Sequence, residues 1–191
     1  MKFINCTYEL HAPEILTIFN DAILNTTALW EYKARTLETM QTWFATKAAG
    51  NFPVIGALDK EGKLIGFASY GTFRPWAAYK YSVEHSVYIR ADQQGKGLGK
   101  LFMHELIKKA KAQGYHTIIG AIDLDNKGSI ALHEKLGFTH SGTMKQAGYK
   151  FGRWLDFAFY QLILETPKEP DENWNKKADQ LISFFALATH T

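Results

Sequence analysis

The sequence predicts a single α/β domain in which helices flank a central sheet. Extended apolar runs alternate with segments whose apolar residues recur every three to four positions, the pattern of strands mixed with amphipathic helices. The chain has 191 residues, of which 46% are hydrophobic. It is long enough for one domain with a well-buried core and short for two domains. A glycine-rich turn at 94–99 between an extended run and a helical run is the most informative segment.

The first half of the chain has the pattern of a strand, two helices and three further strands. Ala12-Pro13-Glu14 is typical of a helix start, because proline and an acid are favoured in the first turn. A turn at 59–63 separates two apolar runs and indicates a hairpin. The predicted elements are a strand at 2–7, a helix from 12, a helix at 37–49, and strands at 52–58, 64–70 and 81–89.

The second half begins with a helix from Leu98, whose apolar residues form one stripe opposite a row of lysines, so it is expected to lie on the sheet. His116–Ile122 is continuously apolar, as in a central strand covered on both faces. A helix at 129–136 and strands at 138–146 and 154–164 complete the domain. Beyond Pro167 the residues become polar and then apolar at 181–187, which predicts a domain at 1–166 and an extension at 167–191 consisting of a polar linker and a short amphipathic helix.

Composition excludes several classes of function. The formal net charge is +3 and the charges are scattered, so no nucleic-acid partner is expected. One cysteine, Cys6, cannot form an internal disulfide, and no signal peptide or membrane span is visible, which indicates a cytoplasmic protein with no membrane partner. His104-Glu105 and His133-Glu134 lack the second histidine of a zinc motif, so no metal is predicted.

The turn Gln94-Gly95-Lys96-Gly97-Leu98-Gly99 indicates an anion site. A strand that breaks into a glycine-rich turn and then a helix presents free backbone N–H groups at the positive end of the helix dipole. A dinucleotide fingerprint needs glycine where the chain has Lys100, and a nucleotide-triphosphate loop needs serine or threonine where it has Leu101. We therefore expect a phosphorylated ligand other than NAD or ATP.

Such a turn can also serve backbone geometry alone, without a ligand. A second segment favours the ligand, because Asn126 opens a helical run that ends in Leu136-Gly137-Phe138. Together, the Q-x-x-G-x-G turn and the Asn-led helix resemble the GNAT superfamily of N-acetyltransferases. The resemblance covers residues 1–165, where the predicted order of strands and helices also agrees with that family.

The resemblance implies the GNAT acyl-CoA N-acyltransferase fold, with a mixed, mostly antiparallel sheet splayed between two strands, and acetyl-CoA as co-substrate. In this family the turn holds the pyrophosphate, the splayed strand edge before it binds the pantetheine arm and faces the thioester oxygen, and a helix start holds the far end of the arm. The matching residues here are Gln94, Gly95, Lys96, Gly97, Leu98, Gly99 and Lys100 in the turn, Val87, Tyr88 and Ile89 on the edge, and Asn126 and Ser129 at the helix start.

Acetyl transfer needs a general base for the incoming ammonium and an acid for the leaving thiolate. Glu84 lies three residues before the strand edge among apolar neighbours, where burial would raise its pKa, although a plain surface glutamate also fits the pattern. Most of the superfamily has a tyrosine as the acid, at the position where this chain has His133. Histidine titrates close to neutral pH, so His133 is a candidate acid or a side chain that only shapes the tunnel.

Four separated blocks narrow the resemblance to the phosphinothricin and methionine sulfoximine N-acetyltransferase branch: 73–76, 83–88, 132–138 and 148–156. Histidine at the position of His133 is usual in that branch. The resemblance implies a homodimer and transfer of acetyl to the α-amino group of a small amino acid such as phosphinothricin, methionine sulfoximine or methionine sulfone.

The substrate side has candidate residues in three segments. Arg74 offers a permanently charged planar fork for a carboxylate or phosphinate, and Phe73 is a candidate wall of the pocket or an ordinary packing residue of its loop. Glu84 and His85 lie on the approach to the thioester. Trp30-Glu31 matches the first substrate loop of the branch.

Two alternatives stay open. A non-catalytic acyl-CoA-binding module would keep the turn but lack a base and a substrate clamp, and the presence of Glu84, Arg74 and His133 favours the enzyme. Another small amine or a protein N-terminus is the alternative acceptor. A basic peptide would need an acidic groove, whereas the segment 73–81 contains Arg74 and Lys80 but no acid.

Overall fold

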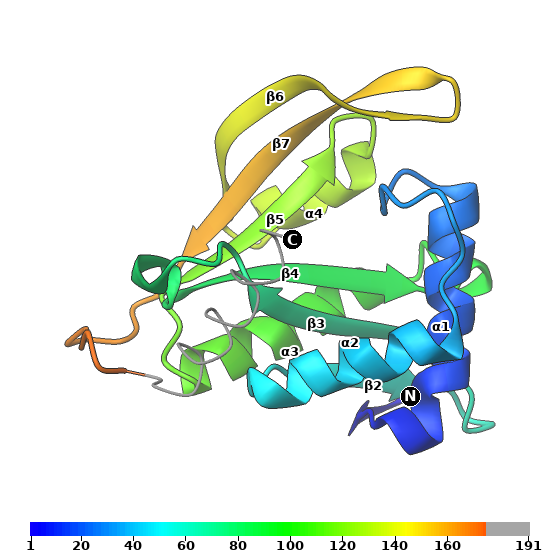
Figure 1. Ribbon diagram of the computed structural model, residues 1–191, viewed down its shortest axis with the longest axis horizontal. Helices are drawn as coiled ribbons and strands as arrows, with labels where there is room; N and C mark the ends of the chain where they lie inside the picture. Colours follow the sequence, from blue (N-terminus) through cyan, green and yellow to red (C-terminus); the bar gives the residue numbers. More distant parts are fainter. Residues whose placement is uncertain (175–191) are drawn as a thin grey trace, which may run out of the picture.

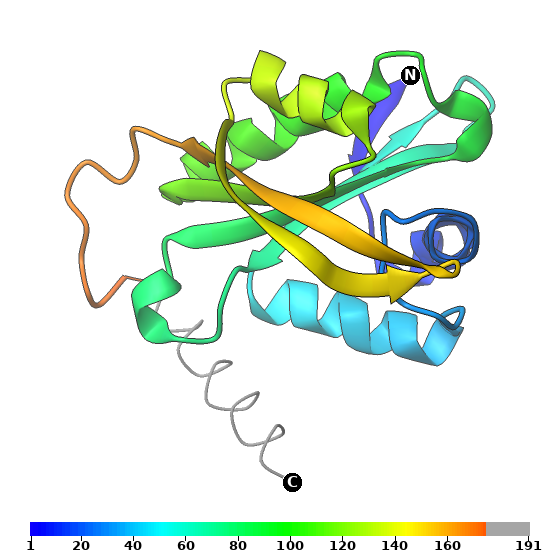
Figure 2. The same cartoon turned by 90° about the horizontal axis from the view of Figure 1, so that it is seen from above.

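A seven-stranded sheet with helices on both faces forms the body of the molecule in a computed structural model that describes residues 1–174. The strands are β1 (Lys2–Asn5), β2 (Val54–Leu58), β3 (Leu64–Thr72), β4 (Ser82–Ile89), β5 (Thr117–Asp123), β6 (Thr139–Lys150) and β7 (Arg153–Ile163). The helices are α1 (Tyr8–Asn25), α2 (Leu37–Ala49), α3 (Leu98–Ala112) and α4 (Lys127–Lys135). Figure 2 shows α1 and α2 on one face of the sheet and α3 and α4 on the other.

Each face of the sheet has its own core. Phe102, Met103 and Leu106 of α3 are fully buried against the sheet, as the apolar stripe of that helix predicts. On the opposite face, α1 and α2 bury an aromatic cluster in which the rings of Phe19 and Phe67 lie 4.7 Å apart. Side chains alternate along a strand, so consecutive residues of β4 face different cores.

The sheet is splayed between β4 and β5, as expected. The strand order is β1-β2-β3-β4-β5-β7-β6, and every neighbouring pair is antiparallel except β4 and β5, which run parallel. Only 82–84 of β4 pair with 117–119 of β5, while β4 continues beside β3 to Ile89. The last five residues of β4 therefore have an open edge on the β5 side (Figure 1).

Two predicted boundaries were wrong. Helix α1 begins at Tyr8, with Thr7 at its N-cap, so Pro13 lies inside the helix instead of at its start. Because proline has no N–H, the carbonyl of Glu9, four residues earlier, loses its helical donor. Both residues are exposed, so water can replace that hydrogen bond and the proline is tolerated. Strand β6 continues past 146 to Lys150, because a bulge around Gln146, with φ of 51°, interrupts its pattern without ending it.

The other predicted elements were confirmed. Most of their ends lie within two residues of the predicted positions, and α2 begins and ends at the predicted residues. Residues 164–174 return to the domain, where Trp174 stacks on Tyr81 with ring centroids 4.5 Å apart. The predicted amphipathic helix at 181–187 lies outside the described residues. No helix within residues 1–174 is long and apolar enough to cross a membrane.

Candidate active site

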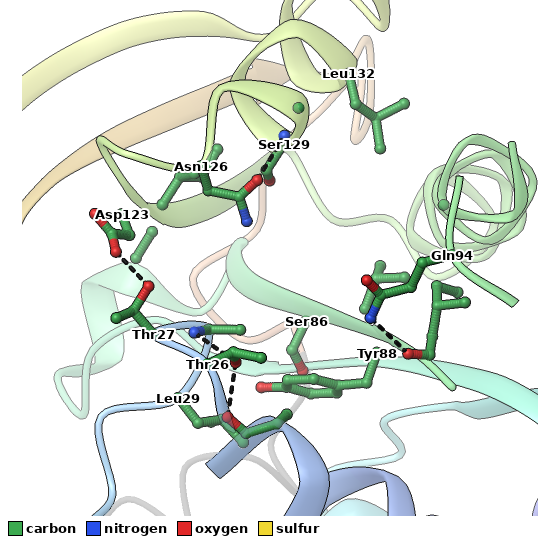
Figure 3. Close-up of a pocket in the computed structure, with 18 of the residues that line it drawn as sticks. Thr26, Thr27, Leu29, Ser86, Tyr88, Gln94, Asp123, Asn126, Ser129 and Leu132 are labelled. Carbon is green, nitrogen blue, oxygen red and sulfur yellow. Dashed lines mark hydrogen bonds between the residues drawn. The ribbon is translucent and has the colours of Figure 1, made fainter. Parts of the chain in front are cut away.

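A cavity of about 1100 Å³ occupies the splay between β4 and β5. Its walls come from the α1–α2 loop, the open half of β4, the turn before α3, the end of β5, the start of α4 and the β6–β7 hairpin. Figure 3 shows residues from most of these elements around one space, with Gln94 on one side and Thr27 and Asp123 on the other. Segments that are distant in the sequence therefore share one site.

The turn before α3 is shaped to receive an anion. Gly95 and Gly97 have φ of 74° and 77°, and a Cβ at either position would meet no atom within 4 Å. Within residues 1–174, none of the backbone N–H groups from Gly95 to Gly99 donates a hydrogen bond, whereas Lys100 N donates to Gly97 O at 3.2 Å. The free donors lie at the N-terminus of a 15-residue helix, so they fit a pyrophosphate.

The side chains of Lys96 and Gln94 bond within the turn and to the end of β4, outside the amide cradle. Lys96 Nζ donates to Asp92 O and Gln93 Oε1, and neither Lys96 nor Lys100 lines the cavity. Gln94 Nε2 donates to Ile89 O at 3.2 Å, which ties the turn to the end of β4 (Figure 3). The backbone of the turn, and not its charged side chains, faces the cavity.

The open edge of β4 is formed by alternate residues. Arg90 N donates to Ile65 O of β3. In an antiparallel ladder, every second residue of a strand bonds to the same neighbouring strand, so the residues of β4 two and four positions before Arg90 also bond to β3. The backbone groups of Tyr88 therefore point to β3, and those of Val87 and Ile89 point to the cavity. Of the three edge residues predicted from the sequence, Val87 offers a free N–H, whereas Tyr88 contributes its buried side chain to the α1 face.

Glu84 lines the cavity at the point where β4 and β5 separate. Burial raises the pKa of Glu84, while the positive charges of Arg74 and Lys47 oppose that shift. A carboxylate with a raised pKa, next to the open strand edge, suits a general base that works near neutral pH. Glu84 is half-buried, and its role as the base stays a prediction.

Lys47 is a neighbour of Glu84 that the sequence analysis missed. Its ammonium donates to Tyr70 O at 2.9 Å and lies 3.2 Å from where a Cβ on Gly71 would be. Gly71 pairs with Glu84 across β3 and β4, so both positions are on one face of the sheet. Burial lowers the pKa of Lys47 to about 8, and the charge of Glu84 opposes the shift. A lysine on the sheet-facing side of α2 was the available signal.

His85 and His133 meet on the other face of β4. His133 is 4% exposed, its Nδ1 lies 2.7 Å from Ser129 O, and its Nε2 lies 2.9 Å from His85 Nε2. Gly120 leaves room for the pair, since a Cβ there would be 2.7 Å from His85 Nε2. His85 follows Glu84 directly and therefore points to the opposite face, toward His133, although the sequence analysis expected both on one approach.

Polar contacts hold the part of the cavity wall that lies between the end of β5 and the start of α4. Asn126 caps α4, with Oδ1 accepting from Ser129 N at 3.0 Å, so the predicted helix start is present. Asp123, which was not singled out from the sequence, accepts a hydrogen bond from Thr27 Oγ1 (Figure 3). It accepts another from Asp125 N. A buried acid at the end of an apolar strand was the signal for this contact.

The remaining substrate candidates divide into two groups. Trp30 lines the cavity and packs edge-on against Phe157, with centroids 5.2 Å apart. Glu31, Phe73 and Arg74 do not line the cavity: Glu31 pairs with Arg35, and the Arg74 guanidinium lies over the Phe73 ring. Arg74 still acts on the site, because its charge lowers the pKa of Glu84. These substrate assignments stay predictions.

The arrangement suits transfer of an acyl group from a phosphorylated carrier to an amine. It combines an amide cradle for phosphate, a free strand edge for an extended amide-containing arm, and a carboxylate that can accept a proton. Among residues 1–174, no three His, Cys, Asp or Glu side chains gather as a metal site. Cys6 is buried, and burial raises the pKa of its thiol to about 12.

Comparisons with known proteins agree with this geometry. Residues 9–159 match the acetyltransferase (GNAT) domain. A methionine sulfoximine/methionine sulfone acetyltransferase of Pseudomonas aeruginosa is 50% identical over 153 residues, which is 80% of this chain and 89% of that protein. A phosphinothricin N-acetyltransferase of Streptomyces viridochromogenes is 36% identical over 135 residues, which is 70% of this chain and 73% of that protein.

A solved structure gives the same fold with a bound coenzyme. The phosphinothricin acetyltransferase of Sinorhizobium meliloti in complex with AcCoA has a TM-score of 0.87 and 34% sequence identity to this chain. The match covers 92% of this chain and 96% of that one. The splayed sheet described above is therefore shared with a protein that was solved with acetyl-CoA.

Proposed function

Because the chain belongs to the GNAT acetyltransferase family, we propose that it transfers acetyl from acetyl-CoA to the α-amino group of methionine sulfoximine, methionine sulfone or phosphinothricin. One observation carries the proposal: the open edge of β4 connects the amide cradle at Gly95–Gly99 to the half-buried carboxylate of Glu84. The chain is therefore an enzyme, an amino-acid N-acetyltransferase.

The acetyl donor would be held along that edge. The free N–H groups of the turn would bind the pyrophosphate, and the backbone of Val87 and Ile89 would pair with the pantetheine amides. The N–H of Val87 faces the place of the thioester oxygen, where negative charge develops during attack. Asn126 and Ser129 would hold the far end of the arm.

The amino acid would approach from the face of Glu84. Glu84 would accept the proton of the attacking ammonium, directly or through a water molecule, so that the free amine attacks the thioester carbonyl. Trp30 would form part of the wall, and Arg74 would attract the anionic end of the amino acid. His133 would support the leaving thiolate side of the cavity.

The test is thiol release from acetyl-CoA by the purified protein. Methionine sulfoximine, methionine sulfone, phosphinothricin, glutamate and a basic peptide are compared at equal concentration. We expect turnover of the first three and little of the last two. Selective turnover of the peptide would assign the site to a protein N-terminus, and equal turnover of all amines would remove the proposed specificity.

Three further features belong to the proposal. The β6–β7 hairpin exposes Met144, Tyr149, Phe151 and Trp154, each more than 45% accessible, which supports a homodimer through this face. We place the protein in the cytoplasm, where acetyl-CoA is supplied and a lone thiol stays reduced. We also assign the acetyltransferase domain to 1–166 and the extension to 167–191.

A further inference from the structure

Lys150 is a buried lysine that the reaction above does not use. It is the last residue of β6 and is 3% exposed. Its ammonium donates to three backbone carbonyls, those of Ile23 at 2.6 Å, Thr26 at 2.8 Å and Leu29 at 2.5 Å. Residues more than 120 positions apart in the sequence are joined at one atom.

The chemistry of this contact is matched on both sides. A lysine ammonium has three N–H donors and no acceptor, and the three carbonyls satisfy all of them. Ile23 and Thr26 lie at the C-terminal end of α1, where the last carbonyls have no helical partner and the helix dipole is negative. An ammonium is the group that fits this place, and an apolar side chain would leave three buried acceptors unpaired.

The contact lies at a seam between the α1–α2 loop and the β6–β7 hairpin. Gly148 lets the Trp30 ring approach, because a Cβ there would be 2.5 Å from the ring. Tyr32 Oη donates to Tyr149 O, next to Lys150. Both views of the chain show the tip of the hairpin beside the end of α1 (Figure 1, Figure 2).

The seam forms one wall of the cavity. Thr26, Thr27, Leu29 and Trp30 from the loop line it, as do Phe151 and Arg153 from the hairpin. The acetyl-CoA cradle at Gly95–Gly99 is built from other elements, whereas the hydrogen bonds of the Lys150 ammonium go to α1 and the α1–α2 loop. A change at Lys150 should therefore move the acceptor wall and leave the donor cradle in place.

We propose that Lys150 is a positioning residue that clamps the α1–α2 loop onto the β6–β7 hairpin and so shapes the amino-acid end of the cavity. The part of this inference that concerns the amino acid rests on the proposed function. The clamp itself does not, since it is defined by the three carbonyl contacts.

The first test measures the clamp without activity. Amide hydrogen exchange of 26–32, where the N–H groups of Thr26 and Ala28 are hydrogen bonded, is compared with that of 102–112 in α3, the helix that follows the cradle. The proteins are the wild type, Lys150→Met and Lys145→Met, a matched change at an exposed lysine of the same strand. We expect exchange at Thr26 and Ala28 to rise at least tenfold in Lys150→Met only, with 102–112 unchanged. Unchanged exchange at 26–32 overturns the clamp.

The second test separates the two substrates. Lys150→Met should raise KM for methionine sulfone at least tenfold while KM for acetyl-CoA stays within twofold of the wild type. An equal rise in both KM values overturns the proposal. If the wild type turns over no amino acid, the proposed function fails, and the exchange experiment still decides the clamp.

A milder variant covers the case in which Lys150→Met does not fold. Lys150→Gln keeps two N–H donors and should raise exchange at 26–32 less than the methionine variant. A further measurement needs the wild type only. The amides of 26–32 and of 148–153 should exchange with the same opening free energy, because the clamp makes the two segments open together. A loop that opens at least tenfold more often than the hairpin overturns the clamp.

Discussion

The contact between Nε2 of His133 and Nε2 of His85, 2.9 Å long, fixes where the protons of both imidazoles lie. The two ring planes are 22° from parallel, and the ring centroids are 5.0 Å apart. His133 Nδ1 must carry a proton, because the carbonyl of Ser129 can only accept. His133 Nε2 then accepts from His85, and His85 Nδ1 is left buried without a partner in the described part of the chain.

We expect both imidazoles to be neutral at pH 7. Burial lowers the pKa of His85 to about 3, with the neighbouring His133 adding to the shift, and burial also lowers the pKa of His133. Nitrogen-15 NMR should find His133 protonated at Nδ1 and His85 at Nε2, with no titration of either above pH 6.5. The opposite tautomers, or an imidazolium at pH 7, would show that the contact is misassigned.

This arrangement constrains the acid that was predicted at His133. A neutral His133 has its only proton directed at Ser129 O, and its Nε2 accepts from His85, so in this arrangement it holds no proton for a thiolate. The pair instead orients the His133 ring. Replacing His85 by leucine removes that orienting contact, so it should lower kcat for methionine sulfone more than it changes KM for acetyl-CoA, whereas an equal effect on both would indicate a purely structural role.

Glu84→Gln removes the candidate base while keeping the size of the side chain. We expect kcat to fall roughly 10²- to 10⁴-fold, with binding of acetyl-CoA unchanged. The wild-type rate should rise with pH as Glu84 loses its proton, at a pH above the ordinary glutamate range because burial raises its pKa. Glu84→Gln should lack this rise of the rate with pH, so the ratio of wild-type to variant kcat should be largest at high pH. A pH profile shared by both proteins would remove Glu84 as the base.

Lys47→Met tests whether the ammonium tunes Glu84. Its positive charge favours the carboxylate, so its removal should raise the pKa of Glu84 and move the acid limb of kcat/KM upward by roughly 0.5 to 1 pH unit. Lys47→Arg should keep the wild-type limb, and Lys63→Met, at an exposed position, serves as the control. An unmoved limb in Lys47→Met would contradict the proposed tuning.

The same variant should be at least as stable as the wild type, because a buried ammonium costs free energy that a methionine does not. Between pH 8 and 10.5 the unfolded chain binds the proton of Lys47 more strongly than the folded one, so wild-type stability gains from rising pH in that range. Urea unfolding at pH 7 should show Lys47→Met equal or stabilised by roughly 1 kcal/mol. A loss above 1 kcal/mol would make Lys47 a structural residue.

The sequence was most informative where one local pattern determines the outcome. The α3 stripe, the hairpin turn at 59–63 and the glycine turn are such patterns, and each lies where it was predicted. The start of α1 was misplaced because proline is favoured in a first turn but is tolerated later on an exposed side. The end of β6 was misplaced because a bulge at Gln146 breaks the alternation of side chains.

The site was less predictable where it depends on contacts between distant elements. Lys47 reaches Tyr70 O on β3, and so acts on the charge of Glu84, only because α2 packs on β3. Lys150 reaches the end of α1 only because the hairpin extends over the molecule. The pairing of His85 with His133 requires the opening between β4 and β5, beside Gly120. No single-sequence pattern contains these distances, although a lysine on an apolar face indicates that its partner is elsewhere in the fold.

Gly97→Ala tests the amide cradle, and the chain provides a matched control at Gly62. Both glycines have positive φ, 77° and 80°, and a Cβ at either would meet nothing within 4 Å, so alanine imposes a similar backbone strain of roughly 1–2 kcal/mol at each. Gly62 lies in the β2–β3 turn, away from the cavity, and Gly97 lines it. We expect both variants to lose similar stability in urea unfolding. Only Gly97→Ala should raise KM for acetyl-CoA, roughly tenfold, because strain there turns the N–H groups away from the pyrophosphate, and equal KM values in the two variants would contradict an anion site at this turn.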